Sequence, residues 1–158
     1  MSERVDILLV EDNDLDVELT LRAMTKHNLT NTVYRVKDGV DALDFLFPAE
    51  ASDRNLHIKV VLLDLKLPKV NGLEVLEKIR SEERTRTLPV VILTSSGESP
   101  DIKKAYDLGA NSYIVKPIDF KDFSSVVTEL GFYWAIINKP PSNAKPKIPY
   151  GKLANTPY

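Results

Sequence analysis

Short apolar runs recur along the chain, and segments with a different periodicity separate them. Five of these runs have the length of strands: residues 5–10, 32–36, 59–65, 89–94 and 112–115. The first, third and fourth runs are apolar almost throughout, as expected of parallel strands that are covered on both faces. The pattern therefore predicts a five-stranded parallel sheet.

The segments between and after these runs have helical spacing, with apolar residues at intervals of three and four positions. The predicted apolar faces are Val17, Leu21 and Met24; Val40, Leu43 and Phe47; Leu73, Leu76 and Ile79; Ile102, Ala105 and Tyr106; and Phe120, Phe123, Val127, Leu130, Trp134 and Ile137. Asn71 and Asp119 stand where helix N-caps are expected. Five strands that alternate with five helices predict a doubly wound three-layer α/β domain with right-handed crossovers.

The helical pattern stops after Ile137. Residues 138–158 contain five of the ten prolines of the chain, and they offer few apolar side chains. Proline cannot continue a helix, and a segment with so few apolar side chains has little to bury. We therefore expect a folded domain over residues 1–137 and an extended Pro-rich tail over residues 138–158, with a polar loop over residues 48–56.

The composition narrows the class of protein. The chain has 158 residues, of which 43% are hydrophobic and 28% charged, as in a single soluble globular domain. A net charge of −2 gives no electrostatic footprint for nucleic acid. The absence of cysteine excludes disulfides, thiolate metal sites and cysteine nucleophiles. No signal peptide and no apolar run of membrane-spanning length is present, so we expect a cytoplasmic protein without a membrane partner.

Functional groups in parallel α/β sheets gather at the carboxyl ends of the strands. At the end of the first predicted strand, the stretch "LLVEDNDLD" (8–16) brings an apolar run up against four acids: Glu11, Asp12, Asp14 and Asp16. Such closely spaced carboxylates repel one another unless a cation lies among them. Taken alone, the stretch is better explained as a polar loop in which Asn13 or Asp14 caps the next helix.

Three further strand ends carry polar groups. The run "VVLLDLKLP" ends at Asp64, with Lys66 two positions later. The run "ILTSSG" brings Thr94 to its end, and "IVKP" places Lys116 before Pro117. Each residue has an ordinary structural role when taken alone. Together, three carboxylates, a hydroxyl and an ammonium at four strand ends indicate a reactive site.

The segments "LLVEDN", "VLLDLKLPKVNGLEVL", "PVVILTSS" and "GANSYIVKPID" resemble, in order and spacing, the receiver domain of two-component response regulators. The similarity spans residues 5 to about 137. The stretch "GFYWAIINKPP" after the last helix is similar to the ending of single-domain receivers related to the phytochrome-associated ones. The resemblance implies a flavodoxin-like, CheY-like fold with strand order 2-1-3-4-5.

The resemblance also implies a chemistry. Asp64 would be the phosphoacceptor, a carboxylate nucleophile that takes a phosphoryl group from a histidine kinase or a phosphotransfer protein. Asp12, Asp64 and the backbone carbonyl of Lys66 would bind Mg²⁺, and Glu11 would bind it directly or through water. Three carboxylates with open coordination positions are independently a hard oxygen site suited to Mg²⁺.

Three more residues receive roles from the resemblance. The ammonium of Lys116 would neutralise charge on the transferring oxygens. Thr94 would hydrogen-bond the phosphoryl group, and Tyr113 would then move inward as part of the conformational switch.

The resemblance carries three finer expectations. Lys66 and Ser96 occupy positions that influence dephosphorylation in this family. The bond between Lys116 and Pro117 is expected to be cis, which X–Pro bonds permit at a low penalty, so that Lys116 points into the site. Glu11 stands where Asp is also common in the family, which would move the metal slightly.

The last predicted helix ends in three consecutive aromatic residues. Consecutive helical positions lie about 100° apart, so the three cannot share one face. Trp134 keeps the core-facing register, which leaves Phe132 and Tyr133 at least partly exposed. Exposed aromatics are typical interface anchors, so we expect a homodimer through this surface with contacts from the tail. The alternative is a monomer in which the tail covers both rings.

The favoured interpretation is a phosphorylatable switch with no output domain of its own and no turnover activity. A Mg²⁺-dependent phosphohydrolase with an Asp nucleophile would have a second acid two residues later, where this chain has Lys66. An FMN-binding module would need a hydroxyl-rich phosphate loop after the first strand, where "EDNDLD" repels phosphate. A phosphorylation-independent receiver-like scaffold is a further alternative, although all five site positions are occupied.

Overall fold

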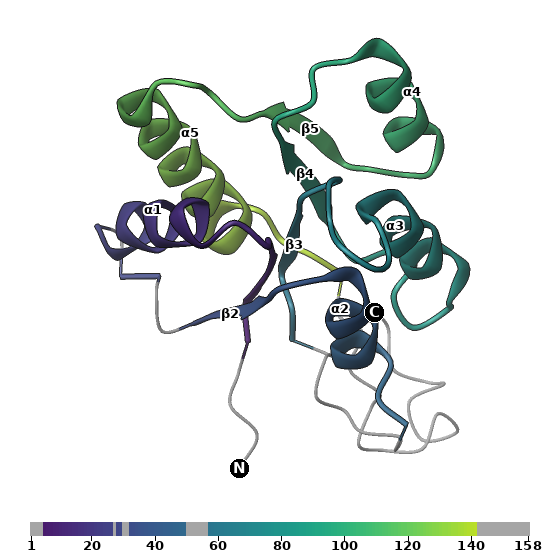
Figure 1. Ribbon diagram of the computed structural model, residues 1–158. Coiled ribbons are helices and arrows are strands. Elements are labelled where there is room, and N and C mark those ends of the chain that lie inside the picture. Colours follow the sequence, from purple (N-terminus) through teal and green to yellow (C-terminus); the bar gives the residue numbers. More distant parts are fainter. Residues whose placement is uncertain (1–4, 27, 30–31, 50–56, 142–158) are drawn as a thin grey trace, which may run out of the picture.

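The computed structural model describes residues 5–26, 28–29, 32–49 and 57–141, and a parallel sheet lies at its centre (Figure 1). Its five strands are β1 (Ile7–Val10), β2 (Val33–Val36), β3 (Val60–Leu63), β4 (Val90–Thr94) and β5 (Ser112–Val115). They pair in the order β2-β1-β3-β4-β5, with every neighbouring pair parallel. Each strand lies within its predicted range, and the predicted fold class and strand order are confirmed.

Helices cover both faces of the sheet. They are α1 (Asp14–Thr25), α2 (Gly39–Leu46), α3 (Gly72–Ser81), α4 (Ser99–Asp107) and α5 (Phe120–Phe132), which continues directly into a π-helix, η2 (Tyr133–Ile137). Helices α1 and α5 lie on one face of the sheet, and α2, α3 and α4 lie on the other (Figure 1). In the described part of the chain, no helix is both long enough and apolar enough to cross a membrane.

Side-chain oxygens cap four of these helices and fix where they begin. Asn13, Asp38, Asn71 and Asp119 each accept a hydrogen bond from a backbone N–H in the first turn of the helix that follows. Such a bond satisfies one of the donors that a helix start leaves unpaired. The predicted caps Asn71 and Asp119 are confirmed, and Asn13 caps α1, which begins within the acidic stretch.

The alternation of strand side chains divides the core into two layers. Successive residues of a strand point to opposite faces. In β1, Leu8 and Val10 pack into the layer beneath α2, α3 and α4, whereas Ile7 and Leu9 pack into the layer beneath α1 and α5. All four side chains are buried. The parallel strands of this sheet bring their carboxyl ends to a single edge.

The predicted face of α2 is rotated relative to the observed one. The buried residues of this helix are Gly39, Ala42, Phe45 and Leu46. Val40, Leu43 and Phe47 are only partly buried, and the latter two pack against the margin of the core. Gly39 lies so close to the loop after β3 that an added Cβ would be 1.9 Å from the Val70 carbonyl oxygen. This contact fixes the rotation of the helix, and the apolar spacing within α2 does not reveal it.

Three further residues predicted in apolar faces are about half exposed or more: Tyr106, Phe120 and Ile137. Helix α4 buries only Ala105, and Phe120 lies in the first turn of α5. The change at Ile137 follows from the π-helix, in which the Asn138 N–H donates to the Tyr133 carbonyl five residues back at 2.7 Å. A π turn breaks the 3.6-residue register, so Ala135 is buried in place of Ile137.

Candidate functional site

Neighbouring strands bring the predicted acids together. β1 and β3 are adjacent and in register, with Val10 opposite Leu63. Glu11 and Asp64, the residues that follow these two, therefore leave the sheet side by side, and both are buried. Glu11, Asp12 and Asp64 each offer a carboxylate oxygen within 4.8 Å of the other two. These oxygens form a cluster of hard ligands at the carboxyl edge of the sheet.

Lys116 follows β5 and brings a cation into this cluster. Its Nζ lies 2.5 Å from Glu11 Oε1, 2.9 Å from Asp64 Oδ2 and 2.9 Å from Asp16 Oδ2. An ammonium has three N–H donors, and here each donor faces a carboxylate. The Lys116 side chain is only 9% exposed. The arrangement explains how the chain tolerates so many acids at one edge of the sheet.

The expected cis bond between Lys116 and Pro117 is wrong, because no cis peptide bond is present in the described residues. The trans form is the more stable one by about 0.5–1 kcal/mol for an X–Pro bond. The extended Lys116 side chain reaches all three carboxylates from the trans backbone. The contact that the cis bond was expected to provide is therefore made without it.

The charges in the cluster shift one another's pKa values. Burial raises the pKa of Glu11 to about 7, helped by the nearby Asp64 carboxylate and opposed by Lys116. Burial would also raise the pKa of Asp64, but the Lys116 ammonium and the Lys66 N–H outweigh it and hold that pKa below its usual value. Burial would lower the pKa of Lys116, but the bonds to Glu11 and Asp16 hold it above its usual value. Asp64 and Lys116 are thus a charged pair at neutral pH.

The end of β4 lies beside the cluster. The Thr94 hydroxyl is close enough to Asp64 to lower the pKa of that carboxyl. It is nevertheless buried without a hydrogen-bond partner of good geometry. Among the described residues, it is the only buried side-chain polar atom in this situation. A buried hydroxyl without a partner is costly, so this atom is suited to a ligand that accepts a hydrogen bond.

Tyr113 and Ser96 are linked to each other. The Tyr113 hydroxyl donates to the Ser96 carbonyl at 2.7 Å, which ties β5 to the loop before α4. The Ser96 hydroxyl donates in turn to Asp101 Oδ2. The Ser96 side chain is therefore engaged with α4. Its neighbour Ser95 instead lines a hollow that lies above the acids.

That hollow has a volume of about 590 Å³ and lies over the cluster, with a rim of polar residues. Lys66 lines it, and its backbone N–H donates to Asp64 Oδ1 at 3.1 Å. Asp64 is fixed from behind as well, because an added Cβ on Gly72 would lie 2.2 Å from the Asp64 carbonyl oxygen. The acceptor oxygens of Asp64 are thus held in a defined position beneath an open hollow.

Two residues at the site were not predicted to belong to it. Asp16 lies in the first turn of α1 and pairs with Lys116. Arg35 comes from β2, and its guanidinium donates to the Glu11 carbonyl at 2.9 Å and to Asp14 Oδ1 at 2.9 Å. Arg35 thereby holds the backbone of the acidic loop. The sequence does not single out either residue: Asp16 is one of several acids in "EDNDLD", and Arg35 belongs to no motif.

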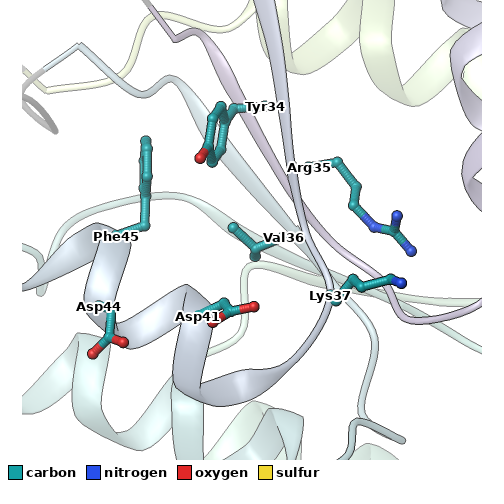
Figure 2. A pocket seen from close by; sticks show the side chains of 7 residues that line it. All are labelled: Tyr34, Arg35, Val36, Lys37, Asp41, Asp44 and Phe45. Atoms are coloured by element: carbon teal, nitrogen blue, oxygen red, sulfur yellow. The ribbon is translucent and has the colours of Figure 1, made fainter.

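A second hollow of about 410 Å³ lies at the outer edge of the sheet, between β2 and α2 (Figure 2). Tyr34 and Phe45 stack along one of its sides, with ring centroids 4.6 Å apart. Figure 2 shows Arg35 and Lys37 on the opposite side of the strand from these rings. The acids of this hollow, Asp41 and Asp44, are not among the described carboxylates that lie close enough to share a cation. The acidic cluster is therefore the stronger candidate for the chemistry.

Comparisons with known proteins agree with this geometry. Residues 7–128 match the model of the response regulator receiver domain family. The chain is 44% identical to the probable methanogenesis regulatory protein FilR2 of Methanothrix harundinacea, over 87% of this chain and 88% of the relative.

Two solved structures resemble the chain along most of its length. The phosphorylated cyanobacterial phytochrome response regulator RcpA is 33% identical, with a TM-score of 0.80 over 88% of this chain and 99% of that one. The Mn²⁺-bound form of the response regulator Rcp1, a protein of Synechocystis, is 30% identical, with a TM-score of 0.80 over 87% and 99%. The acidic cluster is typical of a receiver metal site. The chain is close to the phytochrome-associated response regulators. The chain belongs to the response regulator receiver domain family.

Proposed function

We propose that this receiver domain accepts a phosphoryl group on Asp64 in a Mg²⁺-dependent reaction and passes the signal to a protein partner by a change of conformation. The donor would be a histidine kinase or a phosphotransfer protein. The observation that carries the proposal is the position of Asp64, which lies at the end of a central strand beside two acids and is paired with a buried ammonium.

The environment of Asp64 suits a nucleophile. Its lowered pKa keeps the carboxylate charged at neutral pH. In the transfer, a carboxylate oxygen forms a bond to phosphorus while the bond from phosphorus to the donor's imidazole nitrogen breaks, and the electron pair stays on that nitrogen. The Lys116 ammonium, 2.9 Å from Asp64 Oδ2, lies where it can offset charge on the transferring oxygens.

Glu11, Asp12 and Asp64, with the backbone carbonyl of Lys66, would hold the metal. The three carboxylates lie close enough to share one cation, and oxygen ligands of this kind suit Mg²⁺ with several waters retained. When bound, Mg²⁺ supplies positive charge at the phosphoryl oxygens.

Thr94 and Tyr113 would convert the modification into a change of shape. The Thr94 hydroxyl lacks a hydrogen-bond partner, so a phosphoryl oxygen on Asp64 would satisfy it. Tyr113, which is bonded to the Ser96 carbonyl, would then exchange that bond for a position nearer to Thr94. Lys66 and Ser96 would tune the lifetime of the phosphorylated state.

Phosphorylation can be tested with acetyl phosphate as the donor and intact-mass spectrometry as the readout. We expect a single phosphoryl group on the wild type with Mg²⁺, none after chelation, and none on Asp64→Asn. Asp107→Asn removes an exposed carboxylate of α4 and is the matched control, which should be modified like the wild type. Incorporation into Asp64→Asn would refute the assignment. Steady turnover of small phosphoesters would instead favour a phosphohydrolase.

We also infer that a second copy of the chain binds at the end of α5. Phe132 and Tyr133 are 41% and 47% exposed, and Ile136 and Ile137 extend the apolar surface into η2. Tyr133 and Trp134 line a shallow hollow beside this surface. An exposed, largely apolar surface of this kind suits a two-fold contact with its own copy. The predicted contribution of the tail falls mainly on residues 142–158, which lie outside the described residues.

Sedimentation tests the dimer. We expect the full chain to dimerise at micromolar concentration, and Phe132→Ser with Tyr133→Ser to shift it to monomer. A truncation after Lys139 measures the part that the tail contributes. Tyr106→Ser, which removes an exposed aromatic ring from α4, is the control. A full chain that stays monomeric at high micromolar concentration, with and without phosphorylation, contradicts the inference.

A further inference from the structure

Lys116 has three carboxylate partners, but they are not equivalent. Glu11 and Asp64 belong to the group of acids whose oxygens lie close enough to share a cation. Asp16 lies outside that group, yet its Oδ2 is as close to Lys116 Nζ as that of Asp64, at 2.9 Å. A metal at the cluster would draw on Glu11 and Asp64, and Asp16 would remain the carboxylate that serves the ammonium alone.

The first turn of α1 holds Asp16 firmly. Its backbone N–H donates to the side chain of the N-cap Asn13 at 3.0 Å, and its carbonyl accepts from the Thr20 hydroxyl at 2.7 Å. Asp14, the other acid of this turn, is paired with Arg35. The helix therefore fixes the backbone position of Asp16, and from there its carboxylate reaches Lys116.

We propose that Asp16 is a positioning residue for phosphoryl transfer, which holds the Lys116 ammonium beside Asp64 while the other two carboxylates serve the metal. This inference rests on the proposed function. Asp16 need not touch the phosphoryl group, because it acts through Lys116. Without Asp16, one N–H of Lys116 loses its partner and the long side chain regains rotational freedom, so the ammonium spends less time next to the transferring oxygens.

A double-mutant cycle separates this role from a general effect of charge. The initial rate of Asp64 phosphorylation by acetyl phosphate is measured at saturating Mg²⁺ in four proteins: wild type, Asp16→Ala, Lys116→Ala and the double variant. In this reaction the Asp64 oxygen bonds to phosphorus and acetate leaves with the electron pair of the broken P–O bond. We expect Asp16→Ala to lower the rate about tenfold when Lys116 is present and to change it less than twofold when Lys116 is absent.

Two controls sharpen the cycle. Glu18→Gln removes a negative charge from the same helix, where Glu18 is paired with Arg22, and should leave the rate unchanged. Asp16→Asn keeps an oxygen acceptor and should fall between the wild type and Asp16→Ala. Equal losses for Asp16→Ala with and without Lys116 would overturn the proposal, since Asp16 would then act independently of the ammonium.

A measurement without metal or donor gives a second readout. The ammonium protons of Lys116 exchange slowly with water while carboxylates hold them, so their NMR signal should be observable in the wild type and Glu18→Gln and should broaden or vanish in Asp16→Ala. An unchanged signal would overturn the positioning role even if the rate fell. A wild type that acetyl phosphate does not modify would instead refute the proposed function, which keeps the two failures distinguishable.

Discussion

Glu11 is a buried carboxyl of the site, and its pKa lies near neutral pH. Its pKa is raised from 4.5 to about 7 by burial and by Asp64. Between pH 4.5 and about pH 7, the folded state binds more protons at Glu11 than the unfolded state does. The unfolding free energy therefore falls as the pH rises through this range. The stability that Glu11 contributes is fully present below pH 4.5 and is lost by about pH 7.

Glu11→Gln should therefore gain stability relative to the wild type as the pH is raised across this window in metal-free buffer. Urea unfolding at several pH values from 4.5 to 8 measures the difference. Glu77→Gln, a charge removal at an exposed position of α3, is the control and should follow the wild type. If Glu11→Gln and the wild type have parallel profiles, the proton is not taken up at Glu11.

Gly72 gives a second prediction at the scale of the single residue. A Cβ there would lie 2.2 Å from the Asp64 carbonyl oxygen and 2.6 Å from Leu65 Cα, so the backbone behind the phosphoacceptor would have to move. We expect Gly72→Ala to lower the unfolding free energy by about 2–3 kcal/mol and to impair phosphorylation. Gly97→Ala, whose Cβ would make only ordinary contacts with Val115, should change stability by less than about 1 kcal/mol. Chemical denaturation of both variants decides the matter.

The acids after β1 show what the sequence can and cannot predict about single residues. Their gathering was predictable, because parallel strands deliver their ends to one edge of a sheet. Their division of labour was not, since it depends on the rotation of α1. Residues two apart on a helix point about 200° apart, and accordingly Asp14 pairs with Arg35 while Asp16 pairs with Lys116. No spacing rule reveals which of the two faces the site.

At the scale of elements, one arginine joins three segments. Arg80, near the end of α3, donates to the carbonyls of Gly109, Arg86 and Leu88 and to the Asn111 side chain. Its guanidinium thus ties α3 to the segment before β4 and to the loop between α4 and β5. The planar fork suits this task, because it presents several donors in a fixed geometry.

Replacement of Arg80 should loosen that connection. We expect Arg80→Met to lower the unfolding free energy by roughly 2–3 kcal/mol, since four hydrogen bonds are lost at once, and Arg80→Lys to recover only part of the loss. Arg22→Met removes an exposed pair with Glu18 and should cost less than about 0.5 kcal/mol. Amide hydrogen exchange should show faster opening around Asn111 in Arg80→Met. Protection equal to that of the wild type there would mean that backbone contacts alone hold the loop.

Strands were more predictable than helix faces for a physical reason. A strand buried on both sides is apolar at nearly every position, so its presence does not depend on phase. A helix face depends on phase, and phase is set by partners. For α2 the partner is the loop at Val70, and for the end of α5 it is the change to a π-helix. Apolar spacing reveals neither the contact at Val70 nor the change to a π-helix. Val40 and Ile137 were therefore wrongly predicted to face the core.

At the scale of the whole molecule, the proposed metal should stabilise the fold. A cation that binds the folded cluster of Glu11, Asp12 and Asp64 and not the unfolded chain adds about 1.4 kcal/mol at ten times its dissociation constant. For a chain of 158 residues this corresponds to a rise in Tm of about 3–5 °C.

Thermal unfolding with and without Mg²⁺ measures this gain, with Na⁺ at matched ionic strength as the control for screening. Asp12→Asn should abolish the rise, because it removes a carboxylate of the cluster that does not pair with Lys116. A Tm that rises equally in wild type and Asp12→Asn would place the bound cation elsewhere on the molecule.

The π-helix at the end of the domain makes the chain sensitive to a change in length rather than in residue type. In η2 a backbone bond spans five residues where an α-helix spans four, so residues 133–137 hold one residue more than the α-helical register needs. Deleting one residue there would swing every later side chain by about 100° around the helix axis. The core beneath Val127 would stay as it is, while Ile137 and the residues directly after it would face a different direction. A change of one residue in length at this point would therefore redirect the residues that follow the last helix without altering the site.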